Sequence, residues 1–270
     1  MLTHLLLTFC TINSPVVTMR ELPEERSEIV SQVYFSESVS ILEETQEWEY
    51  IRNLSDGYQG WIKKGQIAQS ESSYPTNPIK VDRLAAHLYH VEDTIYGPNM
   101  TLPYDALLDR LETGERWIKV KTPDGTIGFI QAGDVAAPNL IPFEELPQFS
   151  QKFMGLPYTW GGRSSFGYDC SGFVQMLYRQ AGIALPRDAK DQALWEGFQE
   201  TSFDALSPGD LVFFGPEANK IRHVGMYIGD NRFIHATVAE KAPYIHISKL
   251  SDPDWNGSGR WAFRTAQTLK

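Results

Sequence analysis

The sequence predicts a multidomain chain in which two small all-β barrels are followed by an α+β domain. Three observations predict it: short strands at close spacing in the first half, a weak internal repeat there, and a proline-marked change of pattern near residue 148. The length of 270 residues fits two or three domains. We expect barrels at 1–77 and 78–137, a linker at 138–147 and the last domain at 148–270.

The composition narrows the function classes. Hydrophobic residues make up 42% and charged residues 21% of the chain, as in ordinary globular domains. The formal net charge of -10 argues against a nucleic-acid partner and, more weakly, against a membrane partner. No apolar stretch approaches the roughly 20 residues of a membrane helix. We expect a monomer without a cofactor or a bound metal.

The first residues leave the compartment open. Leu5, Leu6 and Leu7 hint at the apolar region of an export signal, but no Lys or Arg precedes them. The simpler interpretation is a first β-strand in which Cys10 is a small buried hydrophobic residue. We therefore expect a cytoplasmic protein, with export to the cell envelope as the alternative.

The strands of the first half are β-branched or aromatic pieces between turn residues, which is typical of a small barrel or sandwich. The clearest of them are Val33–Phe35, Val39–Leu42, Tyr50–Ile51 and Trp61–Ile62.

The internal repeat predicts two such barrels. Asp56–Ile67 aligns without a gap on Asp124–Val135, with Asp, Gly, Gly, Ile and Gly in common. Upstream, Trp48 and Trp117 lie in matching strands, with one residue of slippage. Two copies are too few for a solenoid, so tandem barrels fit better. Residues 78–102 are harder to place.

A connector follows, marked by Pro138, Pro142 and Pro147, because proline sustains neither helix interiors nor central strands.

The segment Tyr158–Gly172 is rich in Gly and Ser and leads into Phe173–Ala181, where apolar residues recur at helical spacing until Gly182. Cys170 therefore lies at the first turn of a buried helix. The unpaired N–H groups and dipole of that end favour an anion and predict a lowered thiol pKa. We interpret Cys170 as a nucleophile. The alternative is a structural cysteine at the start of a core helix.

A histidine hairpin offers the base that such a nucleophile needs. His223–Ile228 and Arg232–Thr237 read as strands around a turn at Gly229–Asn231, so that His223 and His235 would face each other. His223 would take the thiol proton while His235 orients it. The alternatives are an exposed polar pair, or a zinc site shared with Cys170.

Other segments lack such partners. We expect His4, His87, His90 and His246 to be surface or core residues, and Leu206–Phe214 to be scaffold beneath the helix.

Residues 150–264 resemble the catalytic domain of the NlpC/p60 family. The resemblance rests on the order and spacing of the Tyr-x-Trp-Gly-Gly run, Asp169–Gly172, Pro186–Asp188, Pro208–Leu211, His223–Gly225 and Phe233–Ala236. It implies a papain-like α+β fold. It also implies hydrolysis of the bond between γ-D-glutamate and a diamino acid in the stem peptides of peptidoglycan.

Carried over by position, the resemblance makes Cys170 the nucleophile, His223 the base and His235 the third member of the triad. It makes Tyr158 a residue that holds the tetrahedral intermediate or the catalytic pair. It also implies that Asp169, Ser171 and Asp188 line the substrate pocket. Relatives often carry Ser after Pro-Arg-Asp, whereas this chain carries Ala189, which puts one pocket hydrogen bond in doubt.

Residues 14–137 resemble a pair of bacterial SH3-like domains, and the whole arrangement resembles the intracellular recycling endopeptidases of the family. In that branch the first SH3-like domain restricts cleavage to stems with a free N-terminal L-alanine, using an acidic side chain and a Tyr. Tyr58 is the candidate for this Tyr. The second copy of the repeat has Thr126 at the same place, so the barrel fold does not require a Tyr there. Glu37 is the candidate acid, and a solvated carboxylate is its alternative.

Two other functions stay open. One is a cell-wall-binding protein with an inactive papain-like domain. The other is a cysteine amidase, acyltransferase or toxin on the same fold. The sequence leaves the choice between diaminopimelate and lysine open.

Overall fold

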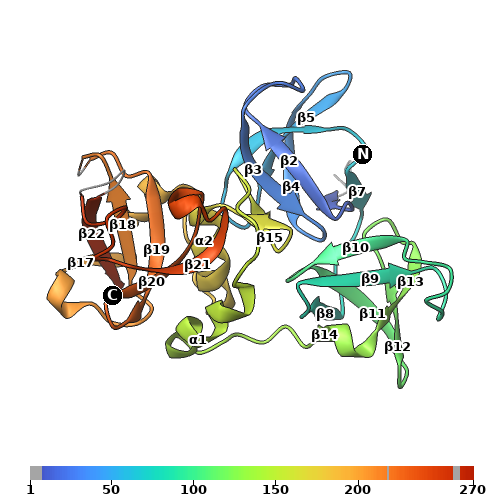
Figure 1. Ribbon diagram of the computed structural model, residues 1–270. Coiled ribbons are helices and arrows are strands. Elements are labelled where there is room, and N and C mark those ends of the chain that lie inside the picture. Colours follow the sequence, from blue (N-terminus) through green and yellow to red (C-terminus); the bar gives the residue numbers. More distant parts are fainter. Residues whose placement is uncertain (1–7, 218, 258–261) are drawn as a thin grey trace. The chain divides into compact units, whose positions relative to one another are not determined.

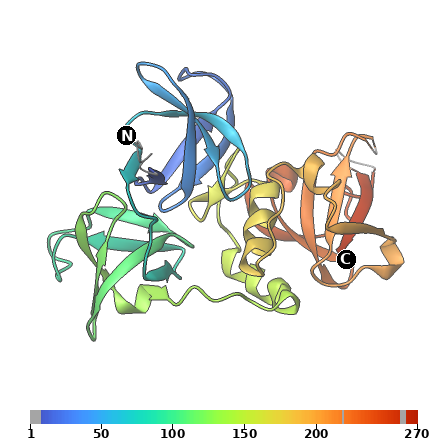
Figure 2. The ribbon, with the colours of Figure 1, turned by 180° about the vertical axis from the view of Figure 1, so that it is seen from behind.

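The structure is a computed structural model that describes residues 8–217, 219–257 and 262–270. It comprises two compact units: residues 1–138 with 164–166, and residues 139–163 with 167–270 (Figures 1 and 2). The Leu5–Leu7 segment, on which the prediction of an export signal depends, lies outside the described residues. The strand predicted around Cys10 is confirmed as β1 (Phe9–Ile12), although Cys10 is only half-buried.

The first barrel is a seven-stranded antiparallel sheet with the order β3-β2-β6-β5-β4-β1-β7. Its other strands are β2 (Val16–Arg20), β3 (Ile29–Tyr34), β4 (Ser38–Glu44), β5 (Trp48–Asn53), β6 (Gln59–Lys63) and β7 (Ile67–Ser70).

The second barrel has the order β10-β9-β13-β12-β11-β8-β14, which is the order of the first barrel strand for strand. The tandem barrels that the repeat predicts are therefore confirmed. Residues 78–102, which the repeat left unplaced, supply its first three strands. The strands are β8 (Pro78–Val81), β9 (Ala85–Tyr89), β10 (Met100–Pro103), β11 (Leu107–Thr113), β12 (Trp117–Lys121), β13 (Ile127–Gln131) and β14 (Val135–Ala136).

The turns explain why the repeat is visible in the sequence. The carboxylate of Asp56 accepts the backbone N–H of Tyr58 at 3.0 Å, and that of Asp124 accepts the N–H of Thr126 at 3.0 Å. The residue between them has positive φ, 74° at Gly57 and 86° at Gly125, where glycine is favoured. The turn that begins at Asn53 is one residue longer than its counterpart in the second barrel, which accounts for the slippage between the tryptophans.

The two barrels share part of a core. Phe35 follows β3 of the first barrel, yet its fully buried side chain packs among the apolar residues of the second. The remaining apolar side chains of each barrel form a cluster of their own.

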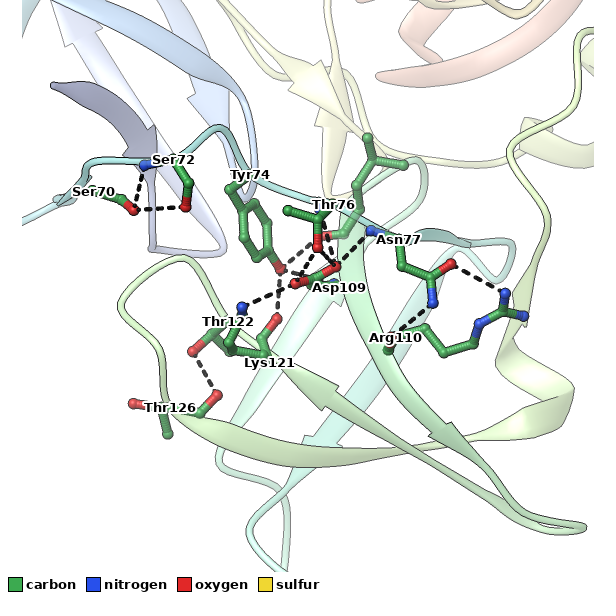
Figure 3. Close-up of polar contacts among 11 residues, drawn as sticks. Ser70, Ser72, Tyr74, Thr76, Asn77, Asp109, Arg110, Lys121, Thr122 and Thr126 are labelled. Carbon is green, nitrogen blue, oxygen red and sulfur yellow. Dashed lines mark hydrogen bonds and ion pairs between the residues drawn. The ribbon is translucent and has the colours of Figure 1, made fainter. Parts of the chain in front are cut away.

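A buried carboxylate fastens the linker between the barrels to the second one (Figure 3). Asp109 accepts the backbone N–H groups of Thr76 at 3.0 Å and Asn77 at 2.7 Å, and pairs with Lys121 at 3.1 Å. The hydroxyl of Tyr74 donates to the carbonyl of Lys121 at 2.8 Å. These contacts fix the segment that leads into β8.

The second unit is built on a six-stranded antiparallel sheet with the order β17-β22-β18-β19-β20-β21. Its strands are β17 (Phe198–Thr201), β18 (Leu211–Gly215), β19 (His223–Gly229), β20 (Arg232–Thr237), β21 (Tyr244–Lys249) and β22 (Ala262–Leu269); β15 (Arg163–Ser164) and β16 (Gly167–Tyr168) form a separate hairpin. Its α-helices are α1 (Leu146–Ser150), α2 (Cys170–Gln180) and α3 (Ala189–Gln192). The α+β papain-like class predicted for this domain is thereby confirmed.

Helix α2 packs against β19 and β20, and all but one of its residues are buried. Tyr178 on α2 donates its hydroxyl to the carbonyl of Gly209 at 2.6 Å, so the turn before β18 supports the helix as expected. The predicted connector also packs here: the N–H of Ile141 donates to the carbonyl of Gln180 at 2.8 Å. No helix in the described part of the chain is both long and apolar enough to span a bilayer.

Candidate active site

Cys170 is the first residue of α2, where the sequence places it. Asp169 is the N-cap, and its side chain accepts the N–H of Gly172 at 2.7 Å. The helix therefore starts at the cysteine because an aspartate precedes it and Phe173 and Val174 anchor its buried face. Cys170 itself is 8% exposed.

The glycines around Cys170 are required by a close backbone approach. A Cβ added to Gly172 would collide with the carbonyl oxygen of Gly162, and one on Gly162 would collide with the carbonyl of Gly167. The loop before β15 thus lies directly against the first turn of α2. This close contact explains why the Tyr-x-Trp-Gly-Gly run ends in Gly162 and why Gly172 follows Cys170 and Ser171.

A buried arginine holds the first turn of α2. The guanidinium of Arg187 is bonded to both carboxylate oxygens of Asp169, at 3.1 and 2.5 Å, and donates to the hydroxyl of Ser171 at 2.8 Å. All three side chains are at least nine-tenths buried. Arg187 therefore contacts two of the predicted pocket residues, Asp169 and Ser171. In the sequence it stood out only as the middle residue of the Pro-Arg-Asp motif.

The thiol pKa differs from the expectation. Burial raises the pKa of Cys170 to about 12, and the carboxylate of Asp169 adds to the rise. Hydrogen bonds from the backbone N–H groups of Val224 and Ser171 act in the opposite direction but are outweighed. The prediction of a lowered pKa is wrong because desolvation exceeds the effect of the helix start. At neutral pH the free protein holds a thiol here, so attack needs a base.

The two histidines meet, but diagonally. Asp230 and Asn231 form the turn with φ of 52° and 59°, and the register then pairs Met226 with Ile234. By continuation His235 lies opposite Gly225, not opposite His223 as expected. The turn lies further along than expected, which moves the pairing by two residues and keeps both rings on one face.

Gly225 is the residue that allows the diagonal contact. A Cβ at this position would lie 2.6 Å from the ring of Phe233 and 3.2 Å from the Cβ of His235. Any larger residue would therefore force the ring of Phe233 to shift and would crowd the Cβ of His235. The His-Val-Gly motif includes a glycine for this reason.

The imidazoles form a buried hydrogen-bonded chain. His223 Nε2 lies 2.7 Å from His235 Nδ1, and His235 Nε2 lies 3.0 Å from the hydroxyl of Ser248. The ring of Trp255 stacks on His223 at 4.8 Å and meets His235 edge-on at 4.8 Å. His235 is fully buried, and this burial, together with the rings of His223 and His246, holds its pKa well below the usual value.

This arrangement bears on the alternatives for the pair. His235 is fully buried, so an exposed polar pair is wrong. The facing nitrogens are at hydrogen-bond distance from each other, which is a geometry different from ligands that converge on zinc. Within the described ranges, no group of three His, Cys, Asp or Glu side chains is placed to hold a metal ion.

His246 has a closer relation to the site than expected. It pairs directly with His235 across β20 and β21, and their ring centroids are 4.9 Å apart. It was predicted to lack partners because its strand could not be placed from the sequence.

Two further pocket candidates lie in the same unit. The backbone of Tyr158 pairs with Tyr168, next to the start of α2, and its N–H donates to the carbonyl of Pro243 at 2.9 Å. Asp188 is the N-cap of α3 and half-buried; burial raises its carboxyl pKa, against the opposing charges of Arg187 and Lys190. Their roles toward a substrate stay predictions.

Glu37 and Tyr58 lie in the first unit, at one end of the first barrel. Glu37 is 9% exposed, so its alternative as a solvated carboxylate is wrong. Its carboxylate accepts the N–H of Tyr34 at 3.0 Å and the amide of Asn53 at 3.2 Å. The backbone N–H of Asn53 in turn donates to the carbonyl of Tyr58 at 2.9 Å. Asn53 thus links the two candidates.

The sequence did not predict three residues that contact the candidate site residues: Ser248, Trp255 and Asn53. Ser248 stands two residues after His246 in an alternating strand, a signal that becomes readable only once the register of β20 and β21 is known. Trp255 lies in an irregular segment, and nothing in its neighbourhood marks it.

A cysteine at a helix start, hydrogen-bonded by the strand that carries one of two paired histidines, is the arrangement of a cysteine peptidase of papain-like architecture. Residues 155–259 match the model of the NlpC/P60 family, and residues 19–67 match that of the bacterial dipeptidyl-peptidase Sh3 domain. The γ-D-glutamyl-L-lysine dipeptidyl-peptidase of Bacillus subtilis (strain 168) is 32% identical over 235 residues, covering 83% of this chain and 77% of that protein. The chain therefore belongs to the NlpC/P60 family of cysteine peptidases.

Other relatives agree. The enzyme of the same name from Bacillus cereus (strain ATCC 10987 / NRS 248) is 29% identical over 85% of this chain and 73% of that protein. The crystal structure of an NlpC/P60 family protein from Bacillus cereus ATCC 10987 shares the fold, with a TM-score of 0.83 and 23% identity over 97% of this chain and 99% of that one.

Proposed function

We propose that the chain is an endopeptidase that hydrolyses the bond between γ-D-glutamate and a diamino acid in peptidoglycan stem peptides. The names of its relatives support this substrate class. The observation that carries the catalytic part is the 2.7 Å contact between His223 Nε2 and His235 Nδ1. In this proposal Nδ1 of His223 takes the thiol proton, and the next residue on the same strand, Val224, donates its backbone N–H to the sulfur of Cys170.

The chemistry follows from these placements. Because the thiol is protonated at rest, His223 takes its proton as Cys170 attacks the γ-glutamyl carbonyl. A carbon–sulfur bond forms, and backbone N–H groups at the start of α2 stabilise the oxyanion. The carbon–nitrogen bond then breaks as His223 returns the proton to the leaving amine. Water, deprotonated by the same imidazole, frees the acyl group.

The preferred substrate in this proposal has a free N-terminal L-alanine, whose amine is bound by Glu37 with the help of Tyr58. Support comes from the second barrel. Ser36 and Asp105 share a φ of 73°, and the next residue accepts an equivalent hydrogen bond, Ile12 to Glu37 and Val81 to Ala106. The second barrel folds with alanine at the equivalent position, so the shared fold does not require a carboxylate there, and we assign the Glu37 carboxylate to the amine in addition to its contacts with Tyr34 and Asn53.

The test is the Cys170→Ala variant incubated with L-Ala-γ-D-Glu-meso-diaminopimelate and with its lysine counterpart, followed by mass spectrometry of the products. We expect the wild type to release L-Ala-γ-D-Glu and the variant to release none. Cys10→Ala, which removes the other free cysteine, is the matched control and should retain activity. Full cleavage by Cys170→Ala, or wild-type products that show a different bond cut, would overturn the proposal.

We also propose the cytoplasm as the place of action, since a small free-amine peptide is a recycling product rather than intact wall. Fractionation of cells that produce the chain, followed by immunodetection, tests this. Recovery of the protein in the envelope fraction would favour the alternative.

A further inference from the structure

Ser248 ends the hydrogen-bonded chain that begins at His223. It lies on β21 opposite Phe233, which places it diagonally from His235 on the same face of the sheet. Its hydroxyl is 3.0 Å from His235 Nε2, and Ser248 is only 4% exposed. The contact is therefore buried at both ends.

The position of one proton decides whether His223 can act as a base. A neutral imidazole has one N–H and one acceptor nitrogen. For Nδ1 of His223 to accept the thiol proton, its own proton must be on Nε2 and be donated to His235 Nδ1. His235 must then carry its proton on Nε2, and the hydroxyl of Ser248, 3.0 Å from that nitrogen, is placed to accept it. The opposite tautomer would turn an N–H of His223 toward the thiol.

We propose that Ser248 is a positioning residue that holds His235 in the tautomer with a proton on Nε2, and thereby keeps Nδ1 of His223 available as the base. This inference rests on the proposed function. The requirement is strictest after proton transfer, because the His223 imidazolium donates from both nitrogens. His235 can accept that bond only through Nδ1.

The surroundings make the hydroxyl hard to replace. His235 and Trp255 are fully buried, and Trp255 covers the edge of the pair. The titratable groups that face His235 are His223 from β19 and His246 from β21. Because His235 Nε2 is sealed from solvent, loss of the Ser248 hydroxyl would leave a buried N–H without an acceptor.

The kinetic test uses Ser248→Ala, Ser248→Thr and, as the matched control, Ser251→Ala on the exposed side of the same segment. We expect Ser248→Ala to lower kcat by roughly tenfold to hundredfold with KM within about twofold. Ser248→Thr keeps a hydroxyl and should restore most of kcat, and Ser251→Ala should match the wild type. Equal activity of the wild type and a folded Ser248→Ala variant would overturn the proposal.

A second measurement works even if Ser248→Ala folds poorly. Long-range ¹H–¹⁵N correlation spectra of the wild type report which nitrogen of His235 carries the proton. We expect a protonated Nε2 at neutral pH, and protonated Nδ1 would contradict the proposal. An inactive Cys170→Ala together with a fully active Ser248→Ala would refute the role of Ser248 alone and leave the proposed function standing.

Discussion

The two barrels have the same strand order but differ at three linked positions. Glu37, Asn53 and Tyr58 of the first correspond to Ala106, Thr122 and Thr126 of the second. The features that the barrels share are structural. An example is the Asp-Gly turn, in which the aspartate carboxylate accepts the backbone N–H of the residue two positions later. A residue that both copies keep is thus needed by the fold. The polar cluster that only one copy has is not required by the shared fold, which is consistent with the proposed role in recognition.

The largest effect is expected from placing the acid of the first barrel into the second. Ala106 is fully buried in an apolar cluster. Ala106→Glu should lower the free energy of unfolding by about 3–5 kcal/mol. Chemical denaturation measures it, with Ala136→Glu on the exposed surface as the control. Equal stability of the two variants would mean that the barrels tolerate the acid alike.

The next prediction concerns Asp109, whose position in the first barrel is taken by Ser40. Burial would raise the pKa of Asp109, but hydrogen bonds from Asn77, Thr76 and Lys121 together hold it below its usual value of 3.8. The stabilisation is therefore present above about pH 4 and is lost as the pH falls through the lowered pKa. Asp109→Ser should lower the free energy of unfolding by roughly 3 kcal/mol at neutral pH.

The measurement is a series of denaturation curves from neutral to acidic pH. The difference between wild type and Asp109→Ser should shrink as the pH falls, whereas Glu92→Gln, which removes an exposed charge, should follow the wild type throughout. A difference that does not change with pH would show that the charge of Asp109 is not what fastens the linker.

Glu37→Ala gives the first barrel the residue that the second already has. We expect kcat/KM for stems with a free N-terminal amine to fall about tenfold to hundredfold, because a charge-assisted hydrogen bond is lost. Cleavage of the same stem with an acetylated amine should be unchanged. Glu37→Gln separates charge from shape. An equal loss on both substrates would contradict amine recognition and indicate a structural role instead.

The smallest effect is expected from exchanging the turn residues. Tyr58→Thr should raise KM for free-amine stems by roughly threefold to tenfold, the size of one neutral hydrogen bond. The reciprocal Thr126→Tyr, at an exposed position of the second barrel, should leave the kinetics unchanged. Comparable losses in both variants would mean that the side chain acts on the turn and not on the substrate.

The elements with strong local signals were predictable from the sequence. The helix at Cys170 follows from its capping aspartate and apolar spacing, and the barrels follow from the Asp-Gly repeat. Pairing distances were harder. The register of His223 and His235 depends on the turn at Asp230 and Asn231, which a sequence pattern locates only to within a residue or two.

Quantities that depend on burial were beyond the sequence. The thiol pKa of Cys170 is set by desolvation from segments distant in the chain, which outweighs the local effect of the helix start. Ser248 and Trp255 join the histidines through strand pairing and side-chain packing that no short motif encodes.

The side chain of Phe35 links the stability of the second barrel to that of the first. It is fully buried in a cluster whose other members all come from the second barrel. The hydrophobic interior of the second barrel is complete only with Phe35 from the first, so the second barrel is not expected to stay folded when the first unfolds. A cut in the chain between the barrels would therefore expose Phe35 on the first piece and leave a cavity in the second.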